Sequence, residues 1–400
     1  MRGGLSSTGQ ECAWRFMLLA AGSRGRPQLR ERLCHFLEGP LDWPYVLKEA
    51  QAQGIAPFLD GAIVSYHLEE LVPLSCRLQL RKVRAQVLRR NLLLLLELKR
   101  VLGYLSTLGV EAIPIKGPVL AETLYEDLSL RPTSDIDILV KPGDLPVCRQ
   151  ALASLGYKCL DLHSEEGHPF HDPPYYLAGS PGLFLELHRA LSHDGLVPLD
   201  LKAMWERAGY ASVDGGRMLT LSPEDNLLFL AYHLTKHVHG PLRWLCDVAQ
   251  LLERYETSLD WPYIVRALPS TGTKNFLYFS LARARRLLGA PIPTSVLEAI
   301  APRGPRRFLL DLVADDQAFL GLRRRLRAER LGLAHCLMHT GVRRVGQAYM
   351  RHLLSDGRGP AWWALFRQGA VGVVRSGLAL LIALGGSQGH NGLGRGQTGD

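Results

Sequence analysis

The chain has 400 residues, of which 47% are hydrophobic and 21% are charged. This balance is typical of a globular protein and excludes an intrinsically disordered one, and the length favours about two or three domains over a single core. The net charge of +9 suits anionic ligands such as nucleotides, nucleic acid or a lipid surface, without choosing among them.

Hydrophobic periodicity first predicts helices. We expect residues 1–30 to be loosely ordered and residues 31–109 to form an N-terminal helical region, which contains a long amphipathic helix at 78–108. Many arginines and lysines lie along this helix. We interpret them as a solvated face and not as a nucleic-acid surface, because no aromatic residues alternate with the charges.

The spacing of the hydrophobic residues then changes, and a small mixed sheet is predicted over residues 110–200. Short apolar or alternating runs predict strands and longer ones predict helices. The expected order is a strand at 110–115, a helix at 118–126, a strand at 135–140, a helix at 145–155 and strands at 157–160, 175–177 and 183–187. Strands mixed with helices in this order predict the α+β fold class, with the sheet between two helical regions.

Helices return in the last part of the chain. The sequence Ser222-Pro-Glu-Asp combines an N-cap, a proline at the first helical position and acids in the first turn. We expect a helical domain at 201–300 that faces a cleft, a C-terminal helical extension at 301–384 and a disordered tail at 385–400.

Cysteine usage and apolar runs bear on the compartment. Seven scattered cysteines without a C-x-x-C pair argue against a disulfide framework or a zinc ribbon, and reduced thiols indicate a cytoplasmic protein. The apolar stretch within 361–386 is interrupted by Arg375, so we expect no stable membrane insertion. Weak contact of this stretch with a membrane surface is the alternative.

Three carboxylates form the candidate catalytic and metal site. Asp135 and Asp137 are two residues apart in a predicted strand, so they share a face, and adjacent carboxylates are costly unless a cation lies between them. Glu186 interrupts another apolar strand, where an unpaired charge is expensive. These three residues predict a site for two Mg²⁺ ions, since Mg²⁺ prefers oxygen ligands. The alternative for Glu186 is a buried ion pair with an arginine.

Two basic residues and a glycine near this group are candidates for binding the phosphates of a nucleotide. Lys116 and Gly117 stand where a strand ends and a helix begins, and free N–H groups at a helix start favour phosphate. Arg131 precedes the aspartates and is the third candidate. The alternative for Arg131 is an ion pair with Asp127 or Glu126.

A second set of residues is expected to contact substrate in the cleft. His188 is two residues after Glu186, on the same strand face. His233 and His237 are four residues apart on one helix face, a spacing that can bind zinc, but the glutamate of H-E-x-x-H is missing. Arg243 and Asp247 are also four apart, which favours a helical ion pair.

The order Lys116-Gly117, helix, Asp135-x-Asp137, strand and Glu186 resembles the DNA polymerase beta-like nucleotidyltransferase superfamily. More narrowly, the chain is similar, over about residues 40–300, to bacterial nucleotidyltransferase family proteins that often accompany natural-product or polysaccharide gene clusters. The similarity includes Leu221–Asp225, the two histidines at 233 and 237, and Arg243–Asp247. The turn departs from the superfamily pattern, because Pro118 follows Gly117 in place of serine or glycine.

The resemblance implies Mg²⁺-dependent transfer of a nucleoside monophosphate from ATP or another nucleoside triphosphate to a hydroxyl group, with release of pyrophosphate. Asp135 and Asp137 would hold the metal and Gly117 would form the triphosphate turn. The acceptor would be a small molecule, a sugar, a peptide or RNA. The alternatives are a catalytically degenerate member that binds nucleotide or serves as a scaffold, and a basic RNA-associated protein.

Overall fold

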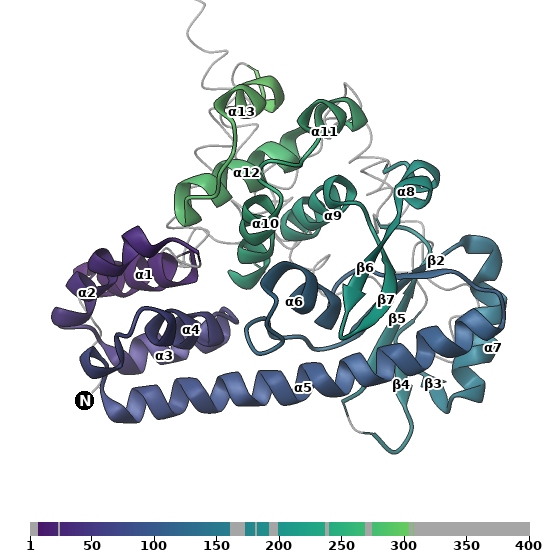
Figure 1. Ribbon diagram of the computed structural model, residues 1–400, viewed down its shortest axis with the longest axis horizontal. Helices are drawn as coiled ribbons and strands as arrows, with labels where there is room; N and C mark the ends of the chain where they lie inside the picture. The colour runs from purple at the N-terminus through teal and green to yellow at the C-terminus, as the bar shows by residue number, and fades with distance from the viewer. Residues whose placement is uncertain are drawn as a thin grey trace, which may run out of the picture.

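The computed structural model describes residues 7–22, 25–160, 173–180, 182–191, 199–236, 240–268, 274–303 and 307. Within them the chain forms a sheet with its own core and a larger helical core, joined by one long helix (Figure 1). Mixed helix and sheet in this arrangement confirms the predicted α+β class. His237 and nearly all of residues 301–400, with the stretch 361–386, lie outside the described residues.

The main sheet has five strands in the order β1-β2-β5-β4-β3. Strands β2 and β5 are parallel, whereas the other neighbouring pairs are antiparallel. The strands are β1 (Ala112–Pro114), β2 (Ile136–Val140), β3 (Tyr157–Cys159), β4 (Tyr175–Leu177) and β5 (Phe184–His188). Each lies close to its predicted position.

The side chains of strand β2 point alternately to the two faces of the sheet. Ile136, Ile138 and Val140 pack into the core of the sheet, whereas Leu139 belongs to the helical core. Since successive residues of a strand point to opposite faces, Asp137 points to the same side as Leu139, toward the helices. The sequence pattern therefore places this carboxylate between the two cores.

Helix α5 (Leu74–Thr107) joins the two cores and runs along the lower edge of the molecule in Figure 1. Its first turns contribute Cys76 and Leu80 to the helical core, and its later turns contribute Leu94 and Leu98 to the sheet core. The predicted solvated basic face is only partly correct. Arg84 forms ion pairs with Asp60 and Asp127, and Lys99 pairs with Asp214. Some of these cations therefore tie α5 to other elements.

The remaining helices include α6 (Pro118–Tyr125) and α7 (Leu145–Ser154), which end within one residue of their predicted positions. The others are α2 (Arg30–Glu38), α3 (Trp43–Ala52), α4 (Ala56–Ser65), α8 (Leu201–Arg207), α9 (Pro223–Lys236), α10 (Arg243–Arg254), α11 (Trp261–Ala267), α12 (Lys274–Leu288) and α13 (Thr294–Ile300). The Ser222 side chain accepts a hydrogen bond from the Asp225 N–H, which confirms the predicted helix start. Short one-turn helices connect several of them.

The loose order expected over residues 1–30 is wrong for residues 7–21, which form helix α1 (Ser7–Ala21). Trp14, Phe16 and Met17 are buried in the helical core, which α9, α10 and α12 also build. Burial of these large side chains stabilises the helix. The N-terminal helices and the later helices thus share one core, although the whole sheet lies between them in sequence.

The helical domain expected at 201–300 also contains strands. It contains a hairpin of β6 (Gly209–Val213) and β7 (Gly216–Thr220). Asp214 and Gly215 form its two-residue turn with φ of 47° and 72°. Asp-Gly is the strongest short hairpin signal, and it was available in the sequence. Most residues of these strands are exposed or half-exposed and the strands hold no run of buried apolar residues, so hydrophobic periodicity did not reveal them.

None of the helices in the described part of the chain combines the length and the hydropathy that a membrane span requires.

Candidate active site

The glycine turn begins one wall of the site. Gly117 lies between β1 and α6 with φ of 71° and ψ of −144°, a conformation that only glycine adopts readily. A Cβ atom at this position would lie 3.4 Å from both the Asp135 carbonyl oxygen and Thr133 Cγ2. The turn is thus packed closely against the segment that leads into β2.

We expect Gly117→Ala to lower the free energy of unfolding by about 1–3 kcal/mol, because alanine is strained at this φ and ψ. Urea denaturation monitored by circular dichroism measures the change. Gly103→Ala is the matched control: Gly103 lies on the exposed side of helix α5 with open space around it, and alanine there should stabilise the helix slightly. Equal stability of Gly117→Ala and the wild-type protein would contradict the strain.

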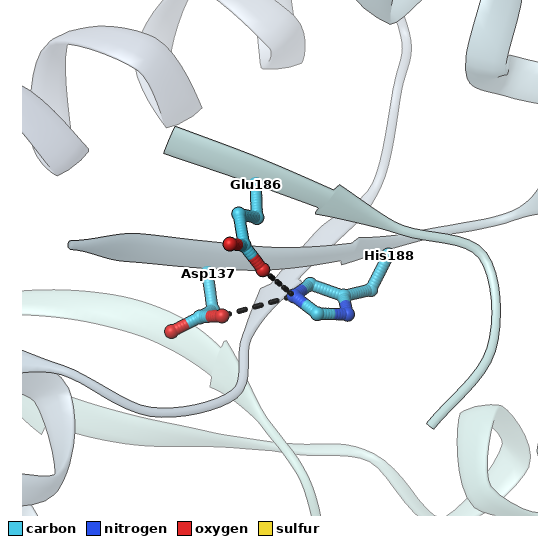
Figure 2. Close-up of side chains that lie close together, drawn as sticks. All are labelled: Asp137, Glu186 and His188. Atoms are coloured by element: carbon cyan, nitrogen blue, oxygen red, sulfur yellow. Dashed lines mark hydrogen bonds and ion pairs between the residues drawn. The ribbon is translucent and has the colours of Figure 1, made fainter. Parts of the chain in front are cut away.

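Two of the three predicted carboxylates, Asp137 and Glu186, come together on neighbouring strands. Because β2 and β5 are parallel and in register, Asp137 lies directly opposite Glu186. His188 lies two residues along β5, and its Nε2 is 2.9 Å from Asp137 Oδ1 and 3.4 Å from Glu186 Oε2 (Figure 2). Glu186 pairs with histidine here and not with the arginine that was the alternative.

Lys116 contacts the same carboxylate. Its Nζ lies 2.8 Å from Asp137 Oδ1, and both side chains are largely buried. The lysine therefore ties the glycine turn to β2. Its predicted contact with phosphate stays a prediction, because in this arrangement its charge is already balanced by Asp137.

Asp135 lies immediately before β2 and is half-buried. Ser134 Oγ donates a hydrogen bond of 2.9 Å to Asp135 Oδ1. Burial and the negative charge of Asp137 raise the pKa of Asp135. Asp135 does not belong to the group of residues whose possible ligand atoms lie within 4.8 Å of one another, so its part in a metal site stays a prediction.

The neighbouring acids and bases shift one another's pKa values in opposite directions. Burial alone would raise the pKa of Asp137, but Lys116 and His188 together hold it well below its usual range. The hydrogen bond from His188 also lowers the pKa of Glu186. Burial opposes the charge on Lys116 and on His188, yet Asp137 raises the pKa of both. The basic side chains and the carboxylates thus offset the cost of one another's burial.

The donor set suits a divalent cation. Asp137, Glu186 and His188 each offer a ligand atom, and these atoms all lie within 4.8 Å of one another. Both contacts to Asp137 go to Oδ1, and Figure 2 shows its other oxygen pointing away from the imidazole. Carboxylate oxygens fit Mg²⁺, and an imidazole nitrogen fits a softer metal equally well. The sequence identified His188 as a substrate contact and missed it as a possible ligand.

Arg131 supports the glycine turn from inside the protein. It is 4% exposed, and its Nε and Nη2 lie 2.8 and 2.9 Å from the two carboxylate oxygens of Asp247, which is 1% exposed. Its Nη1 reaches the Gly117 carbonyl oxygen at 3.4 Å. Tyr125 also donates a hydrogen bond of 2.9 Å to Asp247.

These contacts correct two sequence-based predictions. Arg131 pairs with neither Asp127 nor Glu126, which bind Arg84 and Arg254 instead. Asp247 pairs with Arg131 and not with Arg243. The nearer partners were wrong because the fold brings α10 against α6 and buries this pair, whereas the sequence shows only neighbours along the chain.

The remaining predicted substrate contacts lie on α9 and α10. His233 packs edge-on against Trp244, with ring centroids 4.4 Å apart, and beside Phe229 at 6.1 Å. Arg243 begins α10 and lies against Gly54. The zinc spacing of His233 with His237 is untested, because His237 lies outside the described residues.

The model of a family described as uncharacterised nucleotidyltransferase matches residues 39–289 of this chain. Searches of curated proteins and of solved structures found no significant match. The family match spans the glycine turn, the three carboxylates and the Arg131–Asp247 pair. Because it covers more than half of the 400 residues, the chain belongs to this nucleotidyltransferase family.

Proposed function

We propose that the protein transfers a nucleoside monophosphate from a nucleoside triphosphate to a hydroxyl group in a reaction that depends on Mg²⁺. The observation that carries this proposal is the register of Asp137 opposite Glu186, with the Gly117 turn packed against the segment that leads into β2. Family membership supports the general class of reaction. A cytoplasmic location stays a prediction from the cysteine pattern.

Asp135, Asp137 and Glu186 are the residues that would hold the metal. When bound, Mg²⁺ offsets negative charge on the α-phosphate and on the departing pyrophosphate. The acceptor oxygen forms a bond to the α-phosphorus as the bond to the bridging oxygen breaks. The hydroxyl proton passes to a carboxylate, for which we propose Glu186, the more exposed partner of the opposed pair.

The acceptor would lie toward α9 and α10, the helices that carry His233 and Arg243. His188 is nearly inaccessible, so we propose that it positions Asp137 and Glu186 in place of contacting the acceptor directly. The acceptor class stays open among small molecules, sugars, peptides and RNA.

One observation favours a second candidate, a member that binds nucleotide without turnover. Lys116 and His188 both bond to Asp137 Oδ1, so a metal has to share this carboxylate with an ammonium group and an imidazole. Calorimetric titration with nucleotides and Mg²⁺, followed by an assay for pyrophosphate, separates the two candidates. Binding without pyrophosphate release would favour the second.

The direct test of transfer uses each α-labelled nucleoside triphosphate with Mg²⁺ and a cell extract as the source of acceptor. We expect a labelled product with the wild-type protein and none with the variant that carries both Asp135→Asn and Asp137→Asn. Label on the protein itself would identify self-modification. Salt-sensitive RNA binding that survives the double substitution, without any labelled product, would support an RNA-associated protein instead.

A further inference from the structure

Three basic side chains near the carboxylates differ in what they contact. Lys116 bonds to Asp137, and Arg131 forms a bidentate pair with Asp247. The guanidinium of Arg243 makes neither a hydrogen bond nor an ion pair with any residue that the structure describes, and its carbon lies 5.7 Å from the centroid of the Trp244 ring. Two of the three positive charges are therefore paired with acids of the fold, and the charge of Arg243 is not.

The start of α10 holds Arg243 in place. Its backbone N–H donates to the Gln53 carbonyl oxygen at 3.2 Å, and the Leu242 N–H donates to Gln53 Oε1 at 2.9 Å. Gly54 has a φ of 67°, and a Cβ atom there would lie 2.9 Å from Arg243 Cδ and Nη1. The α3–α4 turn thus fixes the backbone of Arg243, and its glycine leaves room for the side chain.

Arg243 lies on the face of α10 that is linked to the glycine turn through Asp247 and Arg131. Asp247 follows it by one helical turn, so both residues share a face. Asp247 binds Arg131, which in turn reaches the Gly117 carbonyl oxygen. Burial and the positive charge of Arg131 lower the pKa of Arg243, whereas Asp247 and Asp135 act in the opposite direction. The guanidinium therefore lies within the electrostatic reach of Asp135 without bonding to an acid.

We propose that Arg243 binds the triphosphate of the nucleotide from the helical side of the site. This inference rests on the proposed function and assigns the phosphate contact to Arg243 in place of Lys116 and Arg131, whose charges are already paired with Asp137 and Asp247. A guanidinium donates paired hydrogen bonds to phosphate oxygens. An anion bound there would also balance a charge that now has a cation, Arg131, as its neighbour. A bound nucleotide would then bridge the helical core and the sheet.

The test compares binding of the four common nucleoside triphosphates and their monophosphates, by calorimetry in the presence of Mg²⁺. We expect Arg243→Gln to weaken triphosphate binding by about 10- to 100-fold, the range for a charged hydrogen bond, and to weaken monophosphate binding much less. Arg243→Lys should give an intermediate loss, because lysine keeps the charge without the paired donors. Gly54→Ala, which crowds the guanidinium, should also weaken triphosphate binding.

Arg254→Gln is the matched control, since Arg254 ends the same helix and pairs with Glu126 at the surface. It should bind triphosphates as the wild-type protein does. Unchanged triphosphate binding in Arg243→Gln, or an equal loss for triphosphates and monophosphates, would overturn the assignment while leaving nucleotidyl transfer by the wild-type protein intact. Failure of the wild-type protein to bind any triphosphate would overturn both the assignment and the proposed function.

Discussion

Asp137→Asn should lower nucleotidyl transfer by about three orders of magnitude or more. The substitution removes one negative charge from the carboxylates that would hold the metal, and a bound metal contributes several kcal/mol to stabilising the transition state. Each 1.36 kcal/mol corresponds to about a tenfold change in rate. Pyrophosphate release measures the rate, and titration with Mg²⁺ should show weaker binding in the variant.

The loss must be separated from unfolding. An asparagine side chain at this position keeps an oxygen that accepts hydrogen bonds from Lys116 and His188, so we expect the variant to fold, and circular dichroism checks this. Asp144→Asn is the control, because Asp144 lies in the turn just after β2 and outside the carboxylate group. Transfer by Asp137→Asn at more than about a tenth of the wild-type rate would contradict a role for Asp137 in metal binding.

Asp137→Asn should also change how the stability of the protein depends on pH. Although burial opposes the charge on His188, its contact with Asp137 raises the pKa of His188 above that of the unfolded chain, about 6.5. The stability that this interaction contributes is therefore fully present below the unfolded pKa and is lost as the pH rises through the raised pKa. In metal-free protein, the melting temperature of the wild type should show this loss, and Asp137→Asn, which keeps only the contact of His188 with Glu186, should show a smaller one.

The carboxylate group could be predicted because it depends on local pattern. The apolar run around Asp137 predicted one strand and the apolar run around Glu186 predicted another, and the register places these two acids opposite each other. The conformation of Gly117 likewise follows from a strand that ends shortly before a helix begins. Such features involve few residues and short distances along the chain.

The partners of the buried charges could not be predicted in this way. Arg131 has Asp127 and Glu126 as near neighbours, yet it binds Asp247, which is 116 residues further along. Choosing among these acids requires knowing that α10 packs against α6. For the same reason the shared core of α1 with α12 was missed, because periodicity reveals an apolar face but not the helix that covers it.

Asp247→Asn should lower the free energy of unfolding by about 3–5 kcal/mol. Asp247 and Arg131 are both buried, and removing one partner leaves an uncompensated charge inside the protein. Urea denaturation measures the effect. Glu111→Gln is the control: Glu111 pairs with Lys141 at 2.6 Å on the surface, and loss of this exposed pair should cost no more than about 1 kcal/mol. Equal effects of the two substitutions would contradict a structural role for the buried pair.

Replacing both Arg131 and Asp247 distinguishes their contribution to stability from their role in positioning the glycine turn. A variant with Arg131→Met and Asp247→Leu contains no uncompensated charge, so it should recover much of the stability lost by Asp247→Asn. It still lacks the Nη1 group that reaches the Gly117 carbonyl oxygen. We therefore expect a folded protein that binds nucleoside triphosphate more weakly than the wild type, as calorimetry would measure. Wild-type affinity in this variant would mean that the glycine turn keeps its position without the arginine.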